Sequence, residues 1–198
     1  MKGLREGLKS RSLYKLVTAL IYPAVLGTVL YATIQHFYNN AFREPLIACT
    51  LLAVLFHFIL DYWWLSILQH KQGLQEDYGW FSLLVDVVVI AGIFFVFYNI
   101  LDYRLPGIPF RSDIGYKMVA ISLCWIYLAF LFFDCMHKNS YRNWKWTMIN
   151  DWFGFTLSTV FLIIAHLNLC GLGVYMLAFV VCIDSIYVVA VIKNSSRG

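Results

Sequence analysis

The sequence predicts an all-α polytopic membrane protein, a bundle of six transmembrane helices with both termini in the cytoplasm. Three observations favour this fold class: the composition, six long apolar runs, and an uneven distribution of Lys and Arg between the links. Hydrophobic residues make up 61% of the 198 positions and charged residues 13%, whereas soluble domains have about 45–50% and about 25%. A soluble core of this size cannot bury so many apolar residues, which excludes an ordinary soluble domain, and the composition also excludes a disordered chain or a disulfide scaffold.

Each apolar run reaches the roughly 20 residues that a membrane-spanning helix needs. The six predicted spans lie near residues 14–36, 45–68, 79–100, 115–135, 147–167 and 171–192. Because the links between them are short, we expect consecutive helices to pack as antiparallel neighbours. No stretch is left for a soluble domain, so residues 1–198 form a single membrane domain.

The first span follows a basic segment, residues 1–13, that resembles the start of a secretory signal. The apolar run behind it is too long for such a signal and ends without a small-residue cleavage pattern, so we interpret it as a retained helix. Leu4, Leu8 and Ser12 recur at helical spacing among basic residues, which favours a short interfacial helix on an anionic membrane surface. A solvated basic tail is the alternative. Pro23 lies inside the run and predicts a kink.

Sequence signals also mark the remaining spans. Pro45 opens the second span in the first helical turn, where proline is best tolerated. The longest link, residues 101–114, contains Pro106, Gly107 and Pro109 and reads as a turn-rich loop between the third and fourth spans. The fifth and sixth spans are separated by little more than a tight turn.

The orientation follows from the positive-inside rule. Eleven Lys and Arg residues fall on the side of the two termini, and four fall on the other side. Six tryptophans gather at the same boundary, as an aromatic belt does: Trp63, Trp64, Trp80, Trp144, Trp146 and Trp152. We therefore expect an integral protein of the cytoplasmic membrane, facing an anionic inner leaflet. Topology accounts for the net charge of +4, which gives no argument for nucleic acid as a partner.

The strongest functional signal is a set of aspartates within the predicted spans. They are Asp61, Asp86, Asp134, Asp151 and Asp184, and the topology puts all five in the cytoplasmic half. A charged side chain at the bilayer centre costs about 2.5–3.5 kcal/mol on insertion scales. No Lys or Arg occupies a span interior, so these acids must be protonated, hydrated, hydrogen-bonded or neutralised by a bound cation.

Among these acids we single out Asp86, Asp184 and Asp61 as candidate ion- or proton-binding residues, together with His57. His57 and Asp61 are four residues apart and share a helix face, which predicts a hydrogen bond between them or a shared cation. Two ligands do not define a metal site, so the identity of any metal stays open. Asp134 and Asp151 lie near Lys138, Arg142 and Lys145, and interfacial salt bridges are the expectation for them.

We expect these candidate residues to line a polar cavity on the cytoplasmic side, and hydroxyl-bearing residues in the last two spans are candidates for its secondary lining. They are Ser158, Thr159, Ser185 and Tyr187. The alternative is that their hydroxyl groups simply join neighbouring membrane helices by hydrogen bonds.

Several enzyme classes are disfavoured by missing motifs. The chain has no HExxH motif, no GxSxG elbow, no phosphate-binding loop and no CxxC pair. A retinal-binding lysine within a span is also missing, so we predict no cofactor, and an enzyme is the less favoured reading. We expect an ion channel or a proton- or cation-coupled transporter, with a channel requiring a homo-oligomer. The alternatives are a ligand-binding or assembly subunit of a larger membrane complex and, less favoured, a carboxylate-based membrane enzyme.

Overall fold

The computed structural model describes residues 11–40, 45–64, 78–100, 112–137, 144–167 and 171–195, and their regular structure is helical. The helices are η1 (Val17–Ile21), α2 (Tyr22–Asn40), α3 (Pro45–Trp63), α5 (Trp80–Ile100), α6 (Ser112–Met136), α7 (Trp144–His166) and α8 (Leu172–Ser195). Six helical segments are long and apolar enough to cross a membrane. The predicted all-α fold, with six helices long and apolar enough to span a membrane, is thus confirmed.

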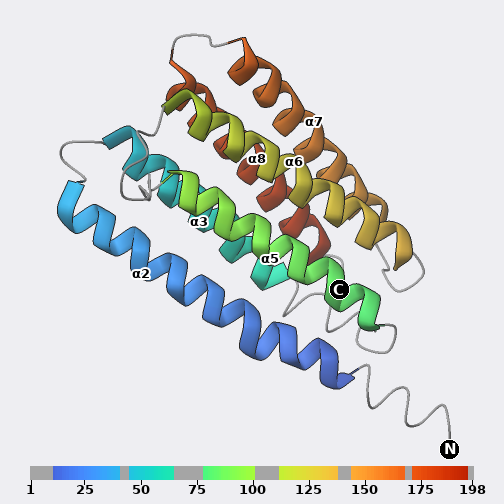
Figure 1. Ribbon diagram of the computed structural model, residues 1–198. Coiled ribbons are helices and arrows are strands. Elements are labelled where there is room, and N and C mark those ends of the chain that lie inside the picture. The colour runs from blue at the N-terminus through green and yellow to red at the C-terminus, as the bar shows by residue number, and fades with distance from the viewer. Residues whose placement is uncertain are drawn as a thin grey trace, which may run out of the picture.

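The helices lie side by side and alternate in direction, forming one elongated bundle (Figure 1). Helix α6 packs most extensively, against α5 on one side and α7 on the other, and α3 packs against α8. Helix α2 lies at the edge of the bundle, on α3 and more lightly on α5. At the lower right end of Figure 1, α2 and α5 begin and α6 ends. We call the half of the bundle nearest this end the acidic half and the other half the apolar half.

The predicted kink at Pro23 takes the form of a π-helical turn. Residues 11–16 are α-helical, η1 follows, and α2 continues the same span. The N–H of Tyr22 donates to the carbonyl of Val17, five residues earlier. A regular helix would aim the carbonyl of Ala19 at the proline ring, which has no N–H to offer. The wider turn avoids that clash, and such insertions often occur at functional sites.

The close packing of α6 depends on glycines in its two neighbours. A Cβ atom at Gly92 of α5 would lie 2.6 Å from the Ile126 side chain. A Cβ atom at Gly154 of α7 would lie 2.2 Å from the ring of Tyr127. Because only glycine leaves this space, α6 approaches both helices closely, as small residues commonly allow in membranes.

The helix ends agree with the predicted spans to within a few residues where both can be compared. Helix α8 covers Leu172–Ser195, against a prediction of 171–192. Helix α3 ends at Trp63, and the last predicted residues of that span, 65–68, lie outside the described part of the chain. The predicted interfacial segment also falls outside it for residues 1–10, while Arg11 to Leu13 continue directly into the first spanning helix.

Candidate functional site

The five membrane aspartates are all buried and come from five different helices. They are Asp61 on α3, Asp86 on α5, Asp134 on α6, Asp151 on α7 and Asp184 on α8, each less than 10% exposed. Four of them line one cavity of about 40 Å³ in the acidic half, the exception being Asp184. A buried water needs roughly 10–15 Å³ measured in this way, so the cavity has room for about three water molecules.

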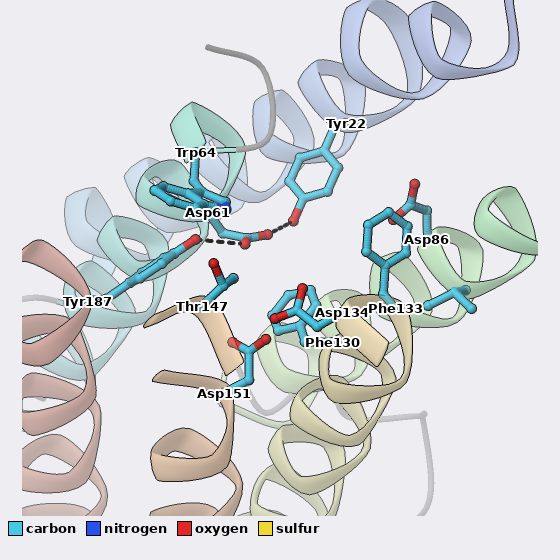
Figure 2. Close-up of a pocket in the computed structure, with 11 residues that line it drawn as sticks. Tyr22, Asp61, Trp64, Asp86, Phe130, Phe133, Asp134, Thr147, Asp151 and Tyr187 are labelled. Atoms are coloured by element: carbon cyan, nitrogen blue, oxygen red, sulfur yellow. Dashed lines mark hydrogen bonds between the residues drawn. The ribbon is translucent and has the colours of Figure 1, made fainter. Parts of the chain in front are cut away.

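The cavity, which we call the acidic cavity, is walled by acids, aromatic rings and a few other side chains (Figure 2). Its lining residues are Tyr22, Asp61, Trp64, Val85, Asp86, Phe130, Phe133, Asp134, Thr147, Asp151 and Tyr187. No lysine or arginine is among these lining residues, so none of the described side chains places a permanent positive charge on the cavity wall.

Asp61 is held by two tyrosine hydroxyl groups from two other helices. Tyr22 donates to Oδ2 of Asp61 from the start of α2, directly after the π-helical turn. Tyr187 of α8 donates to Oδ1 of Asp61 over 3.1 Å. Figure 2 shows both bonds meeting at this carboxyl group. Asp61 therefore connects α2, α3 and α8 at one point.

Asp86 accepts a hydrogen bond from the hydroxyl group of Tyr78, which lies just before α5 and outside the membrane-spanning segment. Burial, and secondarily the neighbouring carboxyl of Asp86, raises the pKa of the Tyr78 phenol. Tyr78 consequently keeps its proton and remains a hydrogen-bond donor. The ring of Tyr14 packs edge-on against Tyr78 at 5.5 Å between centroids.

Asp134 and Asp151 face each other across the cavity, and their carboxyl groups interact directly. Asn150 donates a long hydrogen bond of 3.5 Å to Oδ1 of Asp151. The predicted salt-bridge partners, Lys138, Arg142 and Lys145, have side chains outside the described part of the structure. Sequence reasoning did not place this pair at the cavity. The only signal present was coarse: both aspartates lie toward the ends of two consecutive antiparallel helices that meet at the same link.

Three buried polar atoms on the cavity wall have no hydrogen-bond partner among the residues that the structure describes. They are Nε1 of Trp64, Oγ1 of Thr147 and Oδ2 of Asp134. An unsatisfied buried polar group costs about 1–3 kcal/mol. The three atoms comprise a donor, a hydroxyl group and a carboxyl oxygen. Water, which both donates and accepts hydrogen bonds, has the chemistry to satisfy each of these atoms.

The predicted hydrogen bond between His57 and Asp61 is not formed, and His57 has other partners. His57 lies one turn before Asp61 on α3, roughly 6 Å deeper into the bundle. Its Nδ1 is 2.8 Å from Oδ1 of Asp184, and its Nε2 is 2.9 Å from the hydroxyl oxygen of Tyr127. The prediction was wrong in its partner because residues four apart share a helix face, whereas Asp184 and Tyr127 meet the imidazole from the facing helices α8 and α6.

The predicted secondary residues divide into two groups. Tyr187 reaches the acidic cavity and bonds Asp61. The hydroxyl groups of Ser158, Thr159 and Ser185 donate to carbonyl oxygens of their own helices and are not among the cavity's lining residues. Of the principal candidates, Asp61 and Asp86 share the cavity, and His57 and Asp184 form a separate pair beside it.

Comparison with known proteins adds no name to this site. Among the described residues, no group of three or more His, Cys, Asp or Glu side chains is arranged to hold a metal ion. No protein-family model, no curated protein and no solved structure matches the chain. Its function is therefore inferred from the site alone.

Proposed function

We propose that the protein binds protons in the acidic cavity and moves them across the membrane, as a proton-coupled transporter or a proton channel. One observation carries this proposal. Four carboxyl groups from four helices share a water-sized cavity whose described lining contains no lysine or arginine. Intramembrane acids of this kind are expensive to bury and commonly mark ion or proton pathways.

Charge balance favours protons as the bound species. Two carboxylates in direct contact repel each other, so a pair such as Asp134 and Asp151 is most stable when it shares a proton. Asp61 is different, because two tyrosine hydroxyl groups donate to it, which offsets part of the cost of burying a charge there. The cavity thus holds acids in different hydrogen-bonding surroundings, together with room for about three water molecules. Such an arrangement supports proton uptake and release within one cavity.

The size of the cavity favours binding followed by rearrangement over a wide, water-filled pore. Beyond His57, the space directly beside the imidazole is lined by apolar side chains that include Val54, Leu123 and Val180. The described conformation therefore supports access from the acidic half only. By the positive-inside rule this half faces the cytoplasm, and we place the protein in a cytoplasmic membrane with an anionic inner leaflet. A continuous channel would need a homo-oligomer.

A second candidate function, a ligand-binding subunit of a larger complex, is favoured by an apolar cavity of about 320 Å³ between α2 and α5. Its lining residues are Thr28, Val29, Ala32, Phe94, Phe95, Phe97 and Tyr98. A volume of this order suits a small apolar ligand. Co-purification of a stoichiometric partner or apolar ligand, without proton flux, would favour this candidate.

Flux measurements on reconstituted liposomes test the proposal. The wild type, Asp61→Asn and Asp86→Asn are compared under imposed gradients of H⁺, K⁺, Na⁺ and a divalent cation. We expect proton flux in the wild type and a loss of roughly tenfold or more in each variant, because an amide keeps the shape of the carboxyl but cannot exchange a proton. Ser185→Ala is the matched control, since its exposed hydroxyl bonds only its own helix.

Two outcomes contradict the proposal. If the folded wild type moves no protons with or without a membrane potential, proton transport is wrong. If both Asn variants move protons as fast as the wild type, the acidic cavity is not on the pathway. Flux of K⁺ or Na⁺ that depends on the same aspartates would replace the proton with a small cation.

A further inference from the structure

We infer that His57, Asp184 and Tyr127 form a second proton-binding site, separate from the acidic cavity and in series with it. The inference rests on the proposed function and extends it inward. Both His57 and Asp184 are buried, with exposed fractions of 4% and 7%, and Tyr127 is 1% exposed. The three residues come from α3, α8 and α6, so the site joins three helices.

The hydrogen bonds around His57 allow it to gain a proton without losing a partner. In the neutral ring, Nδ1–H donates to Asp184, and Nε2 accepts the hydroxyl proton of Tyr127. When Nε2 takes a proton, Nε2–H donates to the Tyr127 oxygen, and the hydroxyl hydrogen rotates away. The imidazolium then pairs with the Asp184 carboxylate at 2.8 Å. The proton comes from hydronium or a carboxylic acid of the cavity, which is left as water or carboxylate.

The groups around His57 supply the negative charge that such a proton needs. Asp184 and Tyr187 face the imidazole from α8, and Tyr127 faces it from α6. Asp61 acts on it electrostatically from one turn along its own helix. The nearest described acid of α7 is Asp151, which acts on Tyr127 and Tyr187. Each of these groups is an acid or a phenol, so a protonated imidazole is the positive partner among them.

Two tyrosines connect this site with the acidic cavity. Tyr187 bonds Asp61 through its hydroxyl group, and its ring lies 5.6 Å from the His57 ring between centroids. The ring of Tyr127 fills the space left at Gly154, one turn of α7 beyond Asp151. The second site therefore shares its walls with the first.

The second site is enclosed on its remaining sides by apolar residues. A cavity of about 10 Å³ lies beside His57 and Tyr127, lined otherwise by Val54, Leu123, Val180 and Ile183. This is close to the minimum space for one water molecule. A proton that reaches His57 has no further polar partner toward the apolar half among these lining residues. His57 is consequently the innermost proton-binding residue of the proposed pathway in this conformation.

The experiment combines flux with a direct reading of the imidazole. Nitrogen-15 NMR of histidine-labelled protein follows the protonation of His57, assigned by its loss in His57→Gln. We expect both His57 nitrogens to shift as pH falls, and Tyr127→Phe to alter the Nε2 signal selectively. In liposomes, we expect His57→Gln and Asp184→Asn each to lose roughly tenfold or more of the proton flux.

His137→Gln is the matched control. His137 is as buried as His57 and also has both ring nitrogens in hydrogen bonds, to Ser82 and to the carbonyl of Phe133. It lies outside the acidic cavity, so we expect its variant to keep proton flux within about twofold of the wild type once its folded fraction is matched. Thermal melting of each purified variant separates loss of fold from loss of transfer.

The outcomes separate the two proposals. If Asp61→Asn abolishes flux while folded His57→Gln and Asp184→Asn keep it, the cavity transports protons and the second site is wrong. If the wild type shows no flux, the proposed function fails, and the NMR titration decides the second site independently. A His57 signal that stays neutral across the pH range in which the protein remains folded overturns the inference in either case.

Discussion

The two halves of the bundle satisfy their buried polar groups in different ways. In the apolar half, the hydroxyl groups of Thr33, Thr50 and Ser122 each donate to a carbonyl oxygen four residues earlier on the same helix. In the acidic half, Thr18 also bonds its own helix, but the bonds of Asp61 and His57 to their partners run between helices. Both halves lie within the same six apolar helices, so hydrophobicity alone does not distinguish them.

Polar side chains that bond within one helix and those that bond between helices constrain the fold in different ways. A hydroxyl group bonded to its own helix is satisfied wherever that helix packs. A bond between helices fixes the rotation and depth of both, and it fails if either one moves. The hydrogen bonds of the acidic half therefore fix α2, α3, α6 and α8 relative to one another. The self-bonded hydroxyl groups of the apolar half place no such constraint on their helices.

The largest effect is expected from placing an acid in the apolar half. Leu51 is fully buried on α3, ten residues before Asp61. The tyrosine hydroxyl groups that donate to Asp61 come from Tyr22 and Tyr187 in the acidic half. We expect Leu51→Asp to destabilise the protein by about 3 kcal/mol, the cost of an unpaired charge deep in a membrane. Thermal unfolding in detergent measures this, with the apolar Leu51→Met as control. A Leu51→Asp protein as stable as the wild type would erase the distinction between the halves.

An intermediate effect is expected at the glycine that accommodates Tyr127. A methyl group at Gly154 meets the tyrosine ring at 2.2 Å, so Gly154→Ala must displace the ring, at a cost of about 1–3 kcal/mol. Gly27 on α2 is the control, because a Cβ atom there meets nothing within 4 Å. We expect Gly27→Ala to be neutral or slightly stabilising. Equal melting temperatures for the two variants would show that Tyr127 is not held in place.

A smaller effect is expected from removing single hydroxyl groups. Tyr22→Phe deletes a donor to Asp61 from another helix, and we expect a loss of about 1.5 kcal/mol, typical of a hydrogen bond to a charged group. Thr33→Val deletes a hydroxyl that bonds only its own helix, and we expect a change of about 0.5 kcal/mol or less. Denaturation of the two purified variants side by side compares them. A larger loss for Thr33→Val would reverse the comparison.

Sequence patterns predicted the parts of this protein that depend on distance along a single helix. Apolar length located all six spans, and the positions of the aspartates along those spans predicted that all five would lie in the same half of the bundle. Pro23 predicted an irregularity, although the π-helical form depends on how the neighbouring turns adjust. A single proline shows that the regular backbone hydrogen bonding of the helix is interrupted, but it does not determine the form of the irregular turn.

Sequence patterns did not predict which side chains pair between helices. The spacing of His57 and Asp61 predicted a contact on one helix face, but the rotation of α8 and α6 brings Asp184 and Tyr127 to the imidazole instead. The sequence predicted salt bridges at the membrane interface for Asp134 and Asp151, because basic residues lie between them in the chain. Their mutual contact emerges only when α6 and α7 are packed at close range.

The central claim is that the acidic cavity holds exchangeable protons, and infrared spectroscopy tests it most directly. The carbonyl stretch of protonated carboxyl groups is recorded for the folded protein in lipid as pH is varied, in H₂O and in D₂O. We predict a band that grows as pH falls, shifts in D₂O, and loses intensity in both Asp134→Asn and Asp151→Asn. A spectrum with no pH-dependent carboxyl band, or one that is unchanged in both variants, would contradict the claim.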